Sequence, residues 1–411
     1  MFGQIDNPTL ETRAAVGRMK VGLLLAAGLG LVISGASAQQ STGATGATLN
    51  VATWGGAYGQ SQEIAFFEPF AKETGTKIAM EIYDGSLAKL KGMIDGTSTT
   101  MDVVDVSSSA LGTLCNDGLL EKISITTLGA PPGGQSIEDD FLAGGLSTCG
   151  VASVAWSTAI AFDRKAFSKG EPTEISALLD TTRFPGKRAL PKAPRYTLEL
   201  VLLADGVPPE SIYSELGTEA GADRAFAALD KIRDNILFWD NAEEPITWLL
   251  EEKAAMAAGY SGRIFRAAVG DQRRIGVLWD GQIYDIDAWA IPKAAKNKEE
   301  AIRFISFATS PARLAEQAQL IAYGPMRKSA VELVGKHPII NVEMQGFLPT
   351  APDNFKKALK FDDAWWNANG AALTKRFADW QTQVEAAAAA KEAERKAKEA
   401  QSAEPVSKAA P

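Results

Sequence analysis

Short apolar segments alternate with helical patterns from residue 49 onward. Between the first two apolar segments, large hydrophobic residues recur at the spacing of one helix face, and Gly75 stops the pattern. Strands that alternate with helices pair in parallel and are covered by helices on both faces of the sheet. The sequence therefore predicts an α/β fold. The strand patterns cover residues 49–53, 77–83 and 102–106, and the first helix face is formed by Ile64, Phe67, Phe70 and Ala71.

Each of these strands ends in polar or aromatic residues. Trp54 and Tyr58 follow the first strand, Asp84 follows the second, and Ser107 and Ser109 follow the third. Ligands of open α/β sheets lie beyond the carboxyl ends of the strands, although the same residue types are also common in turns and helix caps. Three such strand ends in succession, the first with an aromatic residue, favour a ligand site.

The chain has 411 residues, more than one compact core usually holds, so we expect two lobes. Long apolar strands near residues 156–162 and 283–290 are expected to cross between them. The charged tail has almost no apolar face, which is typical of a frayed, solvated helix or of disorder. The expected units are lobe 1 (residues 49–157 plus 289–345), lobe 2 (158–288), C-terminal helices packing on the lobes (346–383) and an Ala/Lys/Glu-rich tail (384–411).

The N-terminus has the three parts of a secretory signal peptide. Basic residues come first, an apolar run follows at residues 21–33, and Ala36 and Ala38 stand just before a cut at Gln39. The apolar run is shorter than the roughly 20 residues that span a bilayer, which favours cleavage over a membrane anchor. We therefore expect residues 1–38 to be removed and the mature chain to be exported.

The two cysteines, Cys115 and Cys149, are interpreted in the light of this export. An oxidising compartment usually turns an even pair of cysteines into a disulfide. Two cysteines alone make a poor metal site. The sequence therefore predicts a structural disulfide between them.

Composition and motifs exclude several classes of protein. The formal net charge is −8 and no basic stripe is present, so we expect no nucleic-acid partner. The one histidine, His337, precedes a proline, and the chain has no Gly-x-Ser-x-Gly elbow, zinc motif or P-loop. We therefore expect no enzyme, no metal and no cofactor.

Five motifs in consistent order resemble the spermidine/putrescine-binding branch of the bacterial extracellular solute-binding proteins. The resemblance spans residues 49–383 and implies a type II-like periplasmic binding protein, with two α/β lobes joined by hinge strands. It also implies a periplasmic monomer that captures a small solute in the interlobe cleft and delivers it to an ABC permease in the inner membrane. The motifs are WGGAY from Trp54, GYSGR from Gly259, DIDAWAIPK from Asp285, NKEEAIRFISF from Asn297 and YGP from Tyr323.

The resemblance also implies ligand residues. In polyamine binders, aromatic side chains hold the methylene chain and carboxylates hold the amines. Trp54 and Tyr58 match the aromatic positions, Asp287 matches an amine-binding aspartate, and Tyr260 and Asp285 stand where tryptophans are usual. We add Tyr323 to the expected site because it opens the last matching motif.

The expected ligand is a polyamine-like solute, but a zwitterion remains open. The segment that carries acidic ligand residues in polyamine binders here carries Lys192 and Arg195. Arg195 and Arg263 suit a carboxylate, while Asp285 and Asp287 share one strand face and suit a cation. An ω-amino acid or another amino acid is therefore an alternative ligand, and a periplasmic sensor or adapter, or an enzyme, is an alternative class.

Overall fold

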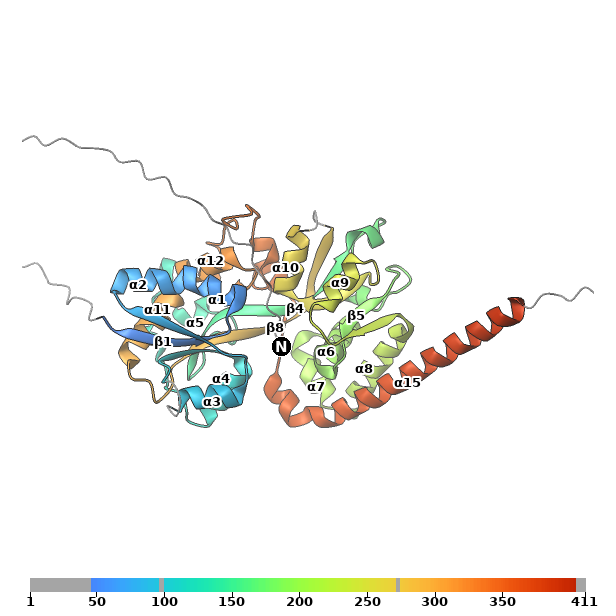
Figure 1. The fold of residues 1–411 in the computed structure, drawn as a ribbon, viewed down its shortest axis with the longest axis horizontal. Coiled ribbons are helices and arrows are strands. Elements are labelled where there is room, and N and C mark those ends of the chain that lie inside the picture. Colours follow the sequence, from blue (N-terminus) through green and yellow to red (C-terminus); the bar gives the residue numbers. More distant parts are fainter. Residues whose placement is uncertain (1–45, 96–99, 271–273, 404–411) are drawn as a thin grey trace, which may run out of the picture.

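The computed structural model describes residues 46–95, 100–270 and 274–403. The expected signal peptide, residues 1–38, lies outside the described residues. The described strands form one mixed sheet in the order β2-β1-β3-β8-β4-β7-β5-β6, with helices on both sides (Figure 1). The predicted α/β class is confirmed. Within the described ranges, no helix combines the length and apolar character needed to cross a membrane.

Three parallel strands form one end of the sheet, where β1 (Thr48–Thr53) lies between β2 (Lys77–Ile82) and β3 (Val103–Ser107). Gly75 ends the helical connection from β1 to β2 in the left-handed conformation, with φ of 76°. This connection consists of α1 (Gly56–Gln62), a π-helical turn (Glu63–Phe67) and α2 (Glu68–Thr74). The helices that follow β2 and β3 are α3 (Leu87–Ile94), α4 (Ser108–Asn116) and α5 (Ile137–Asp140).

The expected position of Ile64 in the core is wrong. The sequence places Ile64 on the buried face with Phe67 and Phe70, but its side chain is 52% exposed. The π-helical turn adds a residue to this part of the helix and rotates Ala65 and Phe66 into the core instead.

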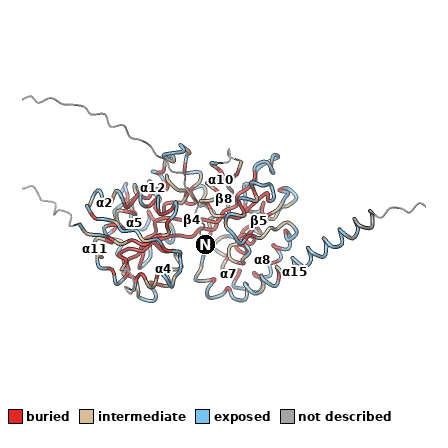
Figure 2. The backbone as a smooth tube through the Cα atoms, viewed as in Figure 1, coloured by how far each residue is buried: buried red, intermediate tan, exposed pale blue. Residues whose placement is uncertain are grey.

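Two long antiparallel strands run through the middle of the sheet. β4 (Gly150–Asp163) and β8 (Ile275–Ala290) pair from Gly150 opposite Ala290 to Asp163 opposite Ile275, with two register shifts. At one end β8 pairs with β3, and at the other β4 pairs with β7. Figure 2 shows that both strands are buried along most of their length. The strand expected at 283–290 begins eight residues earlier, at Ile275, and ends as expected at Ala290.

The other end of the sheet is built from shorter strands. β5 (Arg188–Pro191) is parallel to both β6 (Ile236–Trp239) and β7 (Met256–Tyr260). The helices around these strands are α6 (Pro194–Ala204), α7 (Ile212–Leu216), α8 (Glu219–Ile232), α9 (Glu244–Leu250) and α10 (Ser261–Gly270). The chain then returns to the first end with α11 (Lys298–Ala308), α12 (Pro311–Leu320), β9 (Gly324–Pro325) and α13 (Lys328–Val331).

Separate hydrophobic clusters stabilise the two ends of the sheet. Phe66, Trp289 and Phe304 belong to the first cluster, in which the Trp289 ring lies edge-on to Phe304 at 5.3 Å between centroids. Leu200 and Phe226 belong to the second cluster. A buried tryptophan in such a cluster stabilises the fold through the apolar area that it buries and through the geometry of its ring contacts.

The C-terminal segment ends in a single long helix. After α14 (Pro352–Phe355) and β10 (Leu359–Lys360), α15 (Asp363–Ala403) begins beside α6 and projects beyond the body of the molecule (Figure 1). Its Trp366, Leu373, Phe377 and Trp380 are buried in the second hydrophobic cluster. Of the two states expected for the tail, the helical one is present up to Ala403.

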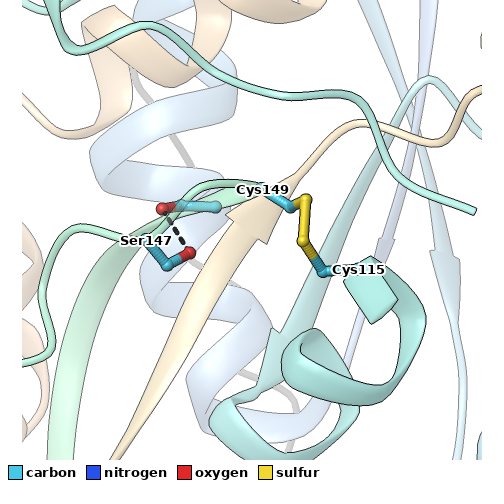
Figure 3. Close-up of a disulfide and its surroundings, with 4 residues drawn as sticks. Cys115, Ser147 and Cys149 are labelled. Atoms are coloured by element: carbon cyan, nitrogen blue, oxygen red, sulfur yellow. Dashed lines mark hydrogen bonds between the residues drawn. A yellow bond between two sulfur atoms is a disulfide. The ribbon is translucent and has the colours of Figure 1, made fainter. Parts of the chain in front are cut away.

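Cys115 and Cys149 form the predicted disulfide. The bond connects the last turn of α4 to the residue before β4 (Figure 3). Next to it, the Ser147 hydroxyl donates a hydrogen bond to the carbonyl of Gly150 at 3.0 Å. The disulfide therefore anchors both ends of the connection between α4 and the central strand β4.

Candidate ligand-binding site

Trp54 is held at the end of β1 by close packing. Its ring lies 4.9 Å from the Tyr83 ring, centroid to centroid. Gly85 adopts φ of 81°, and a Cβ atom there would lie 2.6 Å from the indole ring, so only glycine allows this approach. Asp84, beside it, is exposed and accepts a hydrogen bond from the Ser86 amide at 3.0 Å. This contact assigns Asp84 a turn role.

Tyr58 leads to a carboxylate that the sequence did not single out. The Tyr58 hydroxyl donates to Asp105 Oδ2 at 2.8 Å, and Gln62 Nε2 donates to the same oxygen at 2.5 Å. Asp105 is fully buried on β3, and burial raises its pKa to about 7. It precedes Ser107 by two residues, so both side chains lie on one face of the strand, and this spacing was the available signal.

Asp287 lies on the neighbouring strand. It stands opposite Ser107 in the antiparallel register of β3 and β8, and its side chain is 7% exposed. Burial, followed by the charges of Asp105 and Asp285, raises the pKa of Asp287 well above its usual value, while a hydrogen bond from Trp156 opposes the shift. The site therefore contains two buried carboxylates close enough to repel each other.

Aromatic rings extend from this carboxylate pair. The Tyr58 and Tyr323 rings lie 5.7 Å apart, and Trp156 lies edge-on to Tyr260 at 5.7 Å. Burial and the charge of Asp287 raise the pKa of Tyr323 to about 12, and the charge of Arg263 opposes that shift. The charges of both Asp287 and Arg263 therefore act on the Tyr323 hydroxyl. We refer to Tyr58, Trp156, Tyr260 and Tyr323 as the aromatic cluster.

Arg263 provides the cation of this region. Its guanidinium lies 5.6 Å from the centroid of the Tyr260 ring, and its Nε donates to Glu243 Oε1 at 2.7 Å. Neither Nη atom has a hydrogen-bond partner among the described residues. The contact with Glu243 fixes the side chain while leaving its two outer nitrogen atoms available, which is the geometry for gripping a carboxylate.

Three other predicted residues, Asp285, Ser109 and Arg195, have partners within the protein, and we refer to them as the second group. Asp285 Oδ1 accepts hydrogen bonds from Ser108 Oγ at 2.5 Å and from the Ile286 amide at 2.8 Å. Burial raises the pKa of Asp285 to about 6. Asp285 thus shares a strand face with Asp287 but already has hydrogen-bond donors of its own.

Arg195 and Ser109 are engaged by the start of α15. Arg195 forms an ion pair with Asp363 and donates to Asn367 Oδ1 at 2.8 Å. The Ser109 hydroxyl also donates to Asp363. Asp363 thus links α4 to α6. Of the two arginines predicted for a carboxylate, Arg195 is occupied within the protein.

A cavity of about 1260 Å³ opens between α4, β10 and the start of α15. Ser109, Tyr213, Tyr284, Lys360 and Asp363 contribute to its wall, whereas Asp287, Arg263 and the aromatic cluster do not. This cavity and the carboxylate–arginine arrangement therefore lie in different places. Among the described residues, no group of three or more His, Cys, Asp or Glu side chains is arranged to hold a metal ion.

Comparison with known proteins identifies the family of this chain. Residues 65–343 match the model of the bacterial extracellular solute-binding protein family. The chain is 36% identical to the gamma-aminobutyric acid-binding protein of Pseudomonas aeruginosa, over 85% of this chain and 94% of the relative. It is 26% identical to the spermidine/putrescine-binding periplasmic protein of Escherichia coli, over 65% of this chain and 75% of the relative.

Solved structures agree with this relationship. The Atu4243-GABA receptor superposes with a TM-score of 0.64 at 27% identity, covering 81% of this chain and 97% of that one. The protein AttC of Agrobacterium tumefaciens, in an open unliganded conformation, gives 0.67 at 26% identity, covering 81% of this chain and 99% of that one. The chain therefore belongs to the bacterial extracellular solute-binding protein family and is a solute-binding protein.

Proposed function

We propose that this chain is the substrate-binding component of an ABC importer and that its ligand is an ω-amino acid with the size and charges of γ-aminobutyric acid. The relative named for that ligand is the one with 36% identity over most of both chains. The observation that carries the proposal is the pairing of a partly free arginine with buried carboxylates around one aromatic cluster.

The charges suit a zwitterion. Asp287 would receive the ammonium group, because its buried carboxylate has no ion-pair partner among the described residues. Arg263 would receive the carboxylate through the Nη atoms that Glu243 leaves available. Tyr58, Tyr260 and Tyr323 would contact the methylene groups between the two ends. The residues of the second group would then stabilise the protein around the site without contacting the ligand.

A polyamine is the second candidate. The pair of carboxylates Asp105 and Asp287 favours it, because two buried acids without a cation suit an amine. Several relatives at 24–26% identity are named for spermidine or putrescine. However, a diamine would place its second ammonium near Arg263, which costs repulsion unless Glu243 is released from the arginine.

Capture would work by closure of two lobes. The proposed lobes are residues 49–157 plus 289–345 and residues 158–288, with β4 and β8 as the hinge strands. Tyr58 and Tyr323 belong to the first lobe, and Tyr260 and Arg263 to the second. A ligand that contacts both lobes favours the closed state by its differential affinity for it. We place the mature protein in the periplasm, cut before Gln39.

A calorimetric and thermal-shift panel tests the proposal. The mature chain would be titrated with γ-aminobutyric acid, putrescine, spermidine, an α-amino acid and a neutral sugar. Ligand at about 100 times its Kd adds about 2.7 kcal/mol to the unfolding free energy and raises Tm. We expect γ-aminobutyric acid to give the largest shift. A larger shift with putrescine would favour the polyamine, and no shift with any member would favour the sensor or enzyme classes.

A further inference from the structure

Asp105 and Asp287 are buried carboxylates on adjacent strands. Asp287 stands opposite Ser107, and Asp105 precedes Ser107 by two residues, so the two carboxylates occupy the same face of the sheet. In the described part of the chain, neither takes part in a salt bridge. Asp105 Oδ1 is buried without a hydrogen-bond partner there, although Oδ2 accepts from Tyr58 and Gln62.

Among the residues that the structure describes, no positively charged side chain forms an ion pair with either carboxylate. Tyr58 of α1 donates to Asp105 Oδ2, and the hydroxyl of Tyr83, which follows β2, donates to the Asp105 carbonyl at 2.8 Å. Asp285 precedes Asp287 on β8, and the charges of Asp287 and Arg263 shift the pKa of Tyr323 in opposite directions. Two ionised carboxylates buried in such surroundings would repel each other, which favours a state in which one of them is neutral.

We infer that the Asp105–Asp287 pair holds one proton in the ligand-free protein and that the ammonium group of the ligand displaces this proton on binding. This inference rests on the proposed function, because it requires an ammonium group at Asp287. The charges balance: the protonated pair carries −1, and two carboxylates with one ammonium also carry −1. The displaced proton leaves to solvent, and the net charge of the buried group is unchanged.

Asp105 is a positioning residue in this scheme. Its Oδ2 accepts hydrogen bonds from Tyr58 and Gln62 and its Oδ1 is buried, so in this scheme it acts on the ligand through Tyr58 and Asp287. It acts by setting the charge of Asp287 and the direction of the Tyr58 hydroxyl. Neutral solutes cannot displace the proton, and the pair therefore selects for a cationic head group. Because the two acids titrate together, the released proton belongs to the pair rather than to one residue.

Proton release on binding is the direct test. Calorimetry with γ-aminobutyric acid near pH 7, in two buffers with different ionisation enthalpies, gives the number of protons released per ligand bound. We expect about one proton for the wild type and less than about half of that for Asp105→Asn. Asp379→Asn removes an exposed carboxylate that pairs with Lys375 on α15 and is the control, with release unchanged. Wild-type binding without proton release, or equal release from Asp105→Asn, would overturn the inference while leaving the ligand assignment intact.

Infrared spectroscopy provides a readout that needs no ligand. Glu199 and Asp285 are buried carboxyls whose own bands cancel in the wild-type minus Asp105→Asn difference spectrum. We expect this difference to contain a protonated-carboxyl band near pH 7 that γ-aminobutyric acid removes. Absence of the band in the ligand-free protein overturns the inference alone. If the band persists when γ-aminobutyric acid is added and calorimetry detects no heat of binding, both the proton displacement and the proposed ligand are overturned.

Discussion

The guanidinium of Arg263 lies over the ring of Tyr260, 5.6 Å from its centroid. Both side chains come from the junction of β7 and α10, where the strand ends at Tyr260 and the helix begins at the next residue. This junction therefore places an aromatic ring and a cation side by side in the candidate site. Glu243 from the start of α9 holds the arginine in place through Nε.

Replacing this arginine tests its role in gripping a carboxylate. Arg263→Met should weaken γ-aminobutyric acid binding by about 1.5–3 kcal/mol, roughly 10- to 100-fold, because charge-assisted hydrogen bonds are lost. Arg266→Met is the matched control, since Arg266 lies on the same helix, is exposed and also pairs with Glu243. Calorimetry measures both affinities. Equal losses of affinity from the two variants would show that the arginines act by pairing with Glu243 and that Arg263 does not bind the ligand directly.

Asp287 is tested in the same way for the ammonium group. Asp287→Asn should weaken binding of any ligand with an ammonium group by about 1–3 kcal/mol. The matched control is Asp285→Asn, because Asp285 shares the strand face but is already bonded to Ser108. Affinities from calorimetry would decide. A larger loss from Asp285→Asn than from Asp287→Asn would move the ammonium site to the second group of residues.

Buried Glu199 should make stability depend on pH. Its Oε1 accepts a hydrogen bond from Trp366 Nε1 at 2.5 Å, and burial raises its pKa from 4.5 to about 7. The native state therefore holds this proton to higher pH than the unfolded chain does. The resulting stability is complete below pH 4.5 and is lost as pH rises through about 7.

Glu199→Gln should remove about 3 kcal/mol of this pH dependence. Denaturant unfolding of the ligand-free protein at about pH 5 and about pH 8 measures the difference for each variant. Glu210→Gln, an exposed residue following α6, is the control and should keep the wild-type difference. An unchanged pH dependence in Glu199→Gln would mean that Glu199 is ionised in the native state.

The disulfide should contribute substantially to stability. Cys115 and Cys149 are separated by 34 positions, and closing a loop of this length in the unfolded chain is worth about 4 kcal/mol in the chain-entropy account. The double variant Cys115→Ser/Cys149→Ser should lower Tm by several degrees under oxidising conditions. The wild type under reducing conditions is the control and should show a similar loss. Equal Tm values for all three would contradict this role.

Much of the fold and part of the site follow from local sequence patterns. The positions of Trp54 and Tyr58 were predicted because alternating strands and helices form a parallel sheet, in which the loops after the strands lie at one edge. Asp285 and Asp287 were placed on one face because strand residues alternate. Asp105 was missed although its spacing of two residues from Ser107 placed it on the same strand face, because only the register with β8 shows that this face meets Asp287.

The distinction between the two arginines could not be predicted. Arg195 and Arg263 are equivalent as isolated residues, and both follow the end of a strand. Only the tertiary structure brings Asp363, far along the chain, against Arg195 while Glu243 occupies just one nitrogen of Arg263. The exposed position of Ile64 had a similar origin, because the π-helical turn that rotates it outward has no clear sequence signature.

Whether the ligand carries both charges is decided most directly by a crossed titration. Calorimetry would measure γ-aminobutyric acid and putrescine, which differ in one end group, on the wild type and on Arg263→Met. The account predicts tighter wild-type binding of γ-aminobutyric acid, and a loss of that preference in Arg263→Met. Tighter wild-type binding of putrescine, or an equal loss of both ligands in the variant, would contradict it.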